Sequence, residues 1–133
     1  ERTAEKIKWD IGSASTDAAA EMGSTEVRGR DLVTGLPKTM EVSAKDVSVA
    51  LQDVVASIID AIKGTLEETS PEIAADVIDH GIVLTGGGAL LKHLPDVIAD
   101  ATKVPVFIAN DPLDCVATGT GESLKSIDVM KKK

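Results

Sequence analysis

The chain has 133 residues, 43% of them apolar and 27% charged, a balance typical of a globular domain with one buried core. Its 14 Lys and Arg against 22 Asp and Glu give a net charge of −8, so it gains nothing from counterion release on nucleic acid and offers no basic face to anionic lipid. Only Trp9 and Phe107 are aromatic, which predicts an aliphatic core and argues against stacking on single-stranded bases. We therefore expect no nucleic-acid partner.

The chain has one cysteine, Cys115, so no internal disulfide forms within it, which fits a reducing cytoplasm. We expect this thiol to fill space in an apolar helix. No apolar run reaches the roughly 18 residues of a spanning helix. The chain opens at Glu1 without a methionine and inside a helical pattern, which suggests a piece of a longer protein, and residues 131–133 predict a solvated basic tail.

The first third of the chain predicts a helix, a loop and a hairpin. Residues 1–11 lack Gly and Pro and favour a helix that ends at Gly12. Residues 13–23 are small and polar without an apolar period, so we predict a loop. Two short strands, at 25–30 and 38–42, flank a Gly/Pro turn and predict a thin hairpin that packs on a helix.

The strongest local pattern predicts a helix from about 44 to 68. Ser43 is placed to cap its first turn, with Asp46 facing the free amides. Its apolar stripe consists of Val47, Leu51, Val54, Val55, Ile58, Ile62 and Leu66. Ser70 and Pro71 then predict the start of a short helix, with Ser70 as its cap.

The last third alternates between strand and helix. Residues 81–85 form an apolar strand that ends in a triple glycine, followed by a helical stretch through Ile98. A second apolar strand at 104–108 precedes a final helix, which Asp111 and Pro112 are expected to cap and which runs through Ile127. This order implies parallel strands in an α/β layer.

Two features could bind a ligand. Gly86, Gly87 and Gly88 join a buried strand to a helix, where the missing side chains allow close approach of a ligand or merely a tight turn. The turn is neither a P-loop nor a dinucleotide fingerprint. Glu5 and Lys8 lie on one face of the first helix and offer an acceptor and a donor to a ribose or a base edge, or form a surface salt bridge.

Other polar residues predict no chemistry. His80 and His93 have no metal-ligand spacing, so we expect surface or helix-end histidines and no metal site. No serine or threonine lies in a nucleophile elbow or a triad pattern. Asp114, near Gly119, reads as a helix N-terminal charge, and we assign no catalytic residue.

Several stretches in order resemble the MreB family of bacterial actin-like proteins. The resemblance covers essentially the whole chain and is far more specific than any one of its motifs. It rests on residues 1–8 (ERTAEKIK), 10–14 (DIGSA), 27–32 (VRGRDL), 34–37 (TGLP), 71–74 (PEIA), 81–91 (GIVLTGGGALL), 111–113 (DPL) and 116–117 (VA). Residues 15–23 depart from the family pattern, as a loop allows, and Trp9 stands where the pattern has a smaller or polar residue, which predicts a lateral contact.

The resemblance implies an α/β fold, part of an actin-like (ribonuclease H-like) ATPase domain with a small inserted α+β subdomain. Residues 1–12 and 69–133 would belong to the large subdomain and residues 13–68 to the small one, with the end of the long helix packing back on the large subdomain. The site it implies binds ATP, with Glu5 and Lys8 facing ribose and base and Gly86, Gly87 and Gly88 against them. The two phosphate loops that organise Mg²⁺ in this family lie upstream of Glu1.

The intact parent is then expected to be a cytoplasmic, membrane-associated filament protein. It would assemble with copies of itself, hydrolyse ATP slowly as it polymerises, and maintain rod shape by organising cell-wall synthesis with the elongation machinery at the inner membrane. This chain alone, which has only the adenosine-binding side, is expected to be inactive. Two alternatives remain at this point, a chaperone ATPase of the DnaK type and an acidic interaction domain that binds no nucleotide.

Overall fold

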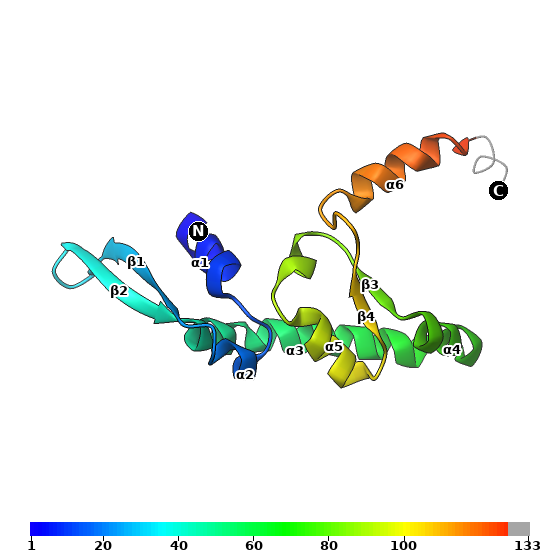
Figure 1. The fold of residues 1–133 in the computed structure, drawn as a ribbon, viewed down its shortest axis with the longest axis horizontal. Coiled ribbons are helices and arrows are strands. Elements are labelled where there is room, and N and C mark those ends of the chain that lie inside the picture. Colours follow the sequence, from blue (N-terminus) through cyan, green and yellow to red (C-terminus); the bar gives the residue numbers. More distant parts are fainter. Residues whose placement is uncertain (128–133) are drawn as a thin grey trace.

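The computed structural model describes residues 1–127, which form a mixed α/β arrangement (Figure 1). The predicted basic tail at residues 131–133 lies outside the described residues. In chain order the elements are α1 (Arg2–Ile11), α2 (Thr16–Ala19), β1 (Ser24–Arg30), β2 (Pro37–Ser43), α3 (Ala44–Glu68), α4 (Pro71–His80), β3 (Ile82–Leu84), the 3₁₀ helix η1 (Gly87–Leu90), α5 (Leu94–Thr102), β4 (Val106–Ile108) and α6 (Cys115–Leu124).

The long helix α3 is the axis to which most other elements attach. Figure 1 shows it running along the long axis of the molecule, with the β1–β2 hairpin at one end and α4 at the other. Its bounds confirm the predicted helix, and the Ser43 hydroxyl accepts a hydrogen bond from the Asp46 amide at 3.1 Å, which confirms the cap. None of the helices within residues 1–127 combines the length and apolarity needed to cross a membrane.

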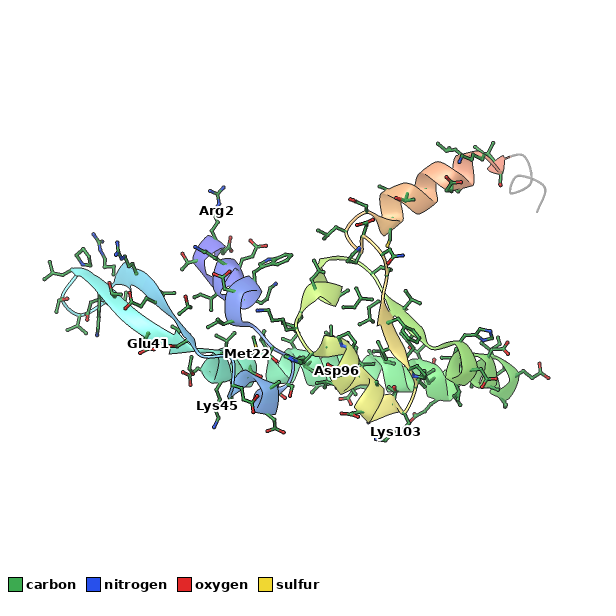
Figure 2. All side chains as sticks on the ribbon, viewed as in Figure 1. Arg2, Met22, Glu41, Lys45, Asp96 and Lys103 are labelled. Atoms are coloured by element: carbon green, nitrogen blue, oxygen red, sulfur yellow. The ribbon has the colours of Figure 1, made fainter. Side chains whose placement is uncertain are left out.

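Two aliphatic clusters form along α3. The cluster near the hairpin surrounds Ala44 and includes Met22, which Figure 2 shows beside the start of α3. Its buried members are Ile11, Ala19 and Ala44. The central cluster joins α3 to α5, and its buried members are Ala14, Val55, Leu94 and Ile98. The scarcity of aromatic residues correctly predicted this aliphatic core.

The hairpin and the second sheet also confirm the sequence analysis. Strands β1 and β2 pair antiparallel, with Val27 opposite Met40. At their turn the Asp31 carboxylate accepts the Val33 and Thr34 amides at 2.8 and 3.0 Å, and these hydrogen bonds, that of Thr34 first, lower the pKa of Asp31. Strands β3 and β4 pair parallel, with Val83 opposite Phe107.

Two predictions about short segments are wrong. The predicted loop at residues 13–23 contains α2, a single turn whose cap is the Ser15 hydroxyl accepting from the Ala18 amide at 3.3 Å. Ser70 precedes α4 as expected, with Pro71 in the first turn, but its side chain makes no capping hydrogen bond.

The helix boundaries after the glycine turn also differ from the prediction. The stretch through Ile98 divides into η1 and α5, because His93 has a left-handed backbone (φ 62°) and Pro95 in the first turn of α5 lacks the amide that a continuous helix requires. The last helix begins at Cys115 with Asp114 as its cap residue rather than at Asp111. Cys115 is only partly buried, at the start of this helix, so the interior role expected for its thiol is wrong.

Gly81, between α4 and β3, is required by its backbone and by its neighbours. Its φ of 85° and ψ of −179° belong to a region that is essentially restricted to glycine. A Cβ here would lie 2.7 Å from the Pro105 carbonyl oxygen and 2.7 Å from Cε2 of Phe107. The glycine therefore allows α4 to turn into the strand that leads to the triple glycine.

We predict that Gly81→Ala lowers the free energy of unfolding by about 1–3 kcal/mol, because the side chain is strained in this conformation. The control is Gly64→Ala in the middle of α3, where a Cβ meets nothing within 4 Å. It should stabilise the protein by about 0.5–1 kcal/mol. Thermal unfolding of the two variants measures both changes, and equal stabilities would contradict the assignment.

Candidate functional site

Candidate residues that are distant in sequence meet at a cavity between α1, α3 and the glycine turn, which we call the α1–η1 cavity. Its volume is about 410 Å³, within the range of small-molecule pockets. Lys8, Gly87 and Gly88 all line it, so the structure brings together two features that lie about 80 residues apart. Its aliphatic walls come from Leu51, Val54, Ile58, Leu84, Leu90, Leu91, Leu94 and Ile98.

A second cavity, the α1–β2 cavity, shares Lys8 and Leu51 with the first and has a volume of about 670 Å³. Glu5 and Lys8 both line it, together with residues of β2 and the first half of α3. Lys8 and Leu51 line both cavities, whereas Glu5 lines only this one. Within residues 1–127 the ion pairs join Lys38 to Asp31 and Lys125 to Glu122, so Glu5 and Lys8 are not paired with each other.

The three glycines of the turn have different surroundings. Gly86 lines neither cavity, and its φ of 79° and ψ of 175° require a glycine, while its amide donates to the Pro112 carbonyl at 2.7 Å. A Cβ on Gly87 would touch only Cδ2 of Leu113, at 3.5 Å, and one on Gly88 would meet nothing within 4 Å. Gly86 is therefore required by the backbone conformation of the turn. Gly87 and Gly88 line the cavity without placing a side chain in it.

The position of α1 beside this turn is fixed by a group of hydrogen bonds that we call the 13–93 clamp. The Lys92 ammonium donates to the Asp10 carbonyl at 2.6 Å, and the Ala14 amide donates to the Lys92 carbonyl at 2.9 Å. The hydroxyl of Ser13, which is fully buried, lies 3.0 Å from Nδ1 of His93. The clamp therefore joins the end of α1 to the segment between η1 and α5.

The chemistry of the cavity favours binding over catalysis. Among its lining residues Lys8 is the one charged side chain, and no acid, histidine or cysteine is present. Aliphatic walls with a single cation suit a flat, uncharged ring that bears hydrogen-bonding groups at its edge. The cavity offers no carboxylate or imidazole to transfer a proton, so the lining residues are suited to holding a ligand.

Sequence reasoning proposed Lys8 and the glycines as site residues, and the structure adds others to the candidate site. The clamp residues Ser13 and Lys92 carried no local signal, because each acts through a partner about 80 positions away. His93 lies at a helix end, as predicted, and also contacts Ser13. Trp9 was noticed as a departure, and the structure places it in the wall of the α1–η1 cavity with 48% of its surface exposed.

Comparison with known proteins identifies similar chains. The family model of the MreB/Mbl proteins matches residues 1–132. The chain is 48% identical over 133 residues to the cell shape-determining protein Mbl of Bacillus subtilis (strain 168), covering all of this chain and 39% of that protein. It is 43% identical over 129 residues to the cell shape-determining protein MreB of Escherichia coli (strain K12), covering 97% of this chain and 37% of that protein.

Solved structures agree with the sequence comparison. The crystal structure of MreB5 of Spiroplasma citri bound to ADP superposes with a TM-score of 0.89 and 34% identity, over 99% of this chain and 40% of that one. The structure of the same protein bound to AMPPNP gives a TM-score of 0.87 and 35% identity, over 98% of this chain and 39% of that one. The chain thus spans about two fifths of the length of the relatives it matches.

We predict that Ser13→Ala loosens the 13–93 clamp and lowers the free energy of unfolding by about 0.5–1.5 kcal/mol, since the buried hydroxyl loses its hydrogen bonds to partly buried partners, His93 and the backbone of Ser15. The control is Ser57→Ala on α3, whose exposed hydroxyl bonds only to the Asp53 carbonyl of its own helix. That change should have little effect. Thermal unfolding of both variants tests the clamp, and a Ser13→Ala protein as stable as the control would show that the clamp contributes nothing.

Proposed function

The chain belongs to the MreB/Mbl family of actin-like proteins, and on this premise we propose that it contributes the adenosine-binding side of an ATP site. The α1–η1 cavity would receive the base, and the ribose would lie toward the α1–β2 cavity, which Glu5 lines. The proposal extends to the longer parent protein, which we propose forms filaments and takes part in setting cell shape. The residues of this chain that we assign to the ATP site are Glu5, Lys8, Gly86, Gly87 and Gly88.

The observation that supports this proposal most is the meeting of Lys8 with Gly87 and Gly88 in one cavity. The MreB5 structures that superpose on the chain are described as bound to ADP and to AMPPNP, so an adenine nucleotide is the natural occupant to test. The aliphatic walls fit the base, and the absent side chains at Gly87 and Gly88 allow it to approach the backbone. Gly86 would hold the turn in shape.

Glu5 and Lys8 would act at the edge of the ligand. Lys8 borders both cavities, so its ammonium is placed to donate to a group that extends from one to the other. Glu5 offers an acceptor from the adjoining α1–β2 cavity, which suits a ribose hydroxyl. We propose that other segments of the parent bind the phosphates and Mg²⁺.

The cellular role is proposed for the parent and follows from its relatives. Two of them are named cell shape-determining proteins. We propose that the parent is cytoplasmic and associates with the membrane. There it assembles with copies of itself, hydrolyses ATP slowly during assembly and works with the cell-wall elongation machinery. Family membership sets aside the chaperone alternative, and an acidic domain without nucleotide remains as an outcome of the binding test.

The division into subdomains is also a proposal. We propose that residues 1–12 and 69–133 belong to the large ATPase subdomain and residues 13–68 to a small inserted one. Each aliphatic cluster along α3 joins the two proposed parts, because Ile11 packs with Ala19 and Ala44 near the hairpin and Val55 packs with Leu94 and Ile98 at the centre. Helix α3 passes through both clusters and would link movements of the two parts.

We predict that Lys8→Ala and Glu5→Ala each weaken ADP binding by the full-length parent about tenfold or more, since a hydrogen bond to a charged group contributes about 1.5–3 kcal/mol. The control is Lys6→Ala, which removes the same charge from the same helix outside both cavities. Isothermal titration calorimetry measures the affinities, and unchanged melting curves confirm folding. If wild-type protein binds no adenine nucleotide, the chain is the nucleotide-free acidic domain instead.

We predict that Gly88→Val abolishes ADP binding in the parent while the fold is retained. A Cβ at this position meets no neighbour within 4 Å, so the protein tolerates the side chain, yet the residue lines the cavity that the base would enter. Gly119→Val in α6 is the matched control, because a Cβ there also meets no neighbour within 4 Å. A folded Gly88→Val protein with wild-type affinity would mean that the glycines form only a turn.

A further inference from the structure

Trp9 is the one tryptophan of the chain, and about half of its surface is exposed in the wall of the α1–η1 cavity. We infer that Trp9 contacts the base of a bound adenine nucleotide and acts as a positioning residue for it. This inference rests on the proposed function and adds a base contact to the residues already assigned. The lateral protein contact expected from the sequence is the competing role.

The surroundings of Trp9 fit an aromatic ligand. The other lining residues are mostly aliphatic, and Lys8 is the single charge among them, so an uncharged purine is better suited to this cavity than a phosphate group. The indole is the one aromatic surface in the lining. Base stacking on an aromatic side chain typically strengthens binding by about tenfold or more, beyond the gain from contact with an aliphatic side chain of similar area.

The backbone around Trp9 is held in place before any ligand arrives. Trp9 lies one residue before Asp10, whose carbonyl accepts the Lys92 ammonium at 2.6 Å. The Gly12 amide donates to the Lys8 carbonyl at 2.9 Å and closes the last turn of α1 around Trp9. The 13–93 clamp thus fixes the backbone from which the indole extends, and only two side-chain torsions remain to be ordered on binding.

The test uses the full-length parent with ADP as the probe. Two variants separate the aromatic face from apolar volume: Trp9→Phe retains a ring, and Trp9→Leu retains an apolar side chain without one. Val49→Ala on α3 is the control, an exposed apolar residue that lines neither cavity. The measurements are calorimetric affinity for ADP, the tryptophan emission that Trp9→Phe removes, and sedimentation of assemblies.

The expected result has three parts. ADP shields the Trp9 emission from acrylamide quenching, Trp9→Leu binds ADP about tenfold more weakly than wild type, and Trp9→Phe retains most of the affinity. If wild type binds ADP but Trp9→Leu binds it equally well, the base contact is wrong and the proposed function stands. Altered sedimentation with unchanged ADP affinity would likewise overturn it in favour of the lateral contact. If wild type binds no ADP, both proposals fall.

Discussion

The structure depends on one junction, the hydrogen bonds that join the end of α1 to the segment between η1 and α5. Residues 10–14 and 92–93 are far apart in sequence, and a short parallel bridge between Ser13 and Lys92, in which the Ala14 amide donates to the Lys92 carbonyl, brings them together. Through this junction the glycine turn and α1 come to lie against the same stretch of α3. Figure 1 shows α1 and the yellow-green turn between β3 and α5 on one side of that helix.

The junction also explains why the cavity combines an apolar surface with a charged side chain and exposed backbone. Its base is the apolar surface of α3, which forms because Leu51, Val54 and Ile58 recur at helical spacing. Its rim contains Lys8 from α1 and two glycines from the turn, which are local features of unrelated segments. A ligand that fills it touches α1, α3 and η1 at once, so binding would stabilise the same arrangement that the hydrogen bonds establish.

Local patterns predicted most elements of the fold, and long-range contacts account for what they missed. The stripe on α3, the hairpin residues and the parallel strand pair were predicted because each depends on neighbouring residues. The division of the predicted helix into η1 and α5 depends on the left-handed backbone of His93, which the apolar periodicity of the sequence does not indicate. The role of Ser13 depends on a histidine about 80 residues away, for which one sequence gives no signal.

In the candidate site, too, some features were predicted from local patterns and others required the structure. Glu5, Lys8 and the triple glycine were predicted, and the structure places Lys8, Gly87 and Gly88 on one cavity. Their spacing alone favoured a salt bridge and a tight turn, and the resemblance to a family was needed to relate them to one ligand. Gly86 and Gly88 differ in backbone conformation, since Gly86 has a positive φ and Gly88 does not, and Gly88 lines the cavity whereas Gly86 does not; both differences require the structure.

We propose that α1 and the glycine turn hold an adenine nucleotide between them. A crystal structure of the full-length parent with ADP would show where the nucleotide binds. We expect electron density for the base within the α1–η1 cavity, between Lys8 and the backbone of Gly87 and Gly88. Density for the base at another place, or another segment of the parent filling this cavity while ADP is bound elsewhere, would contradict it.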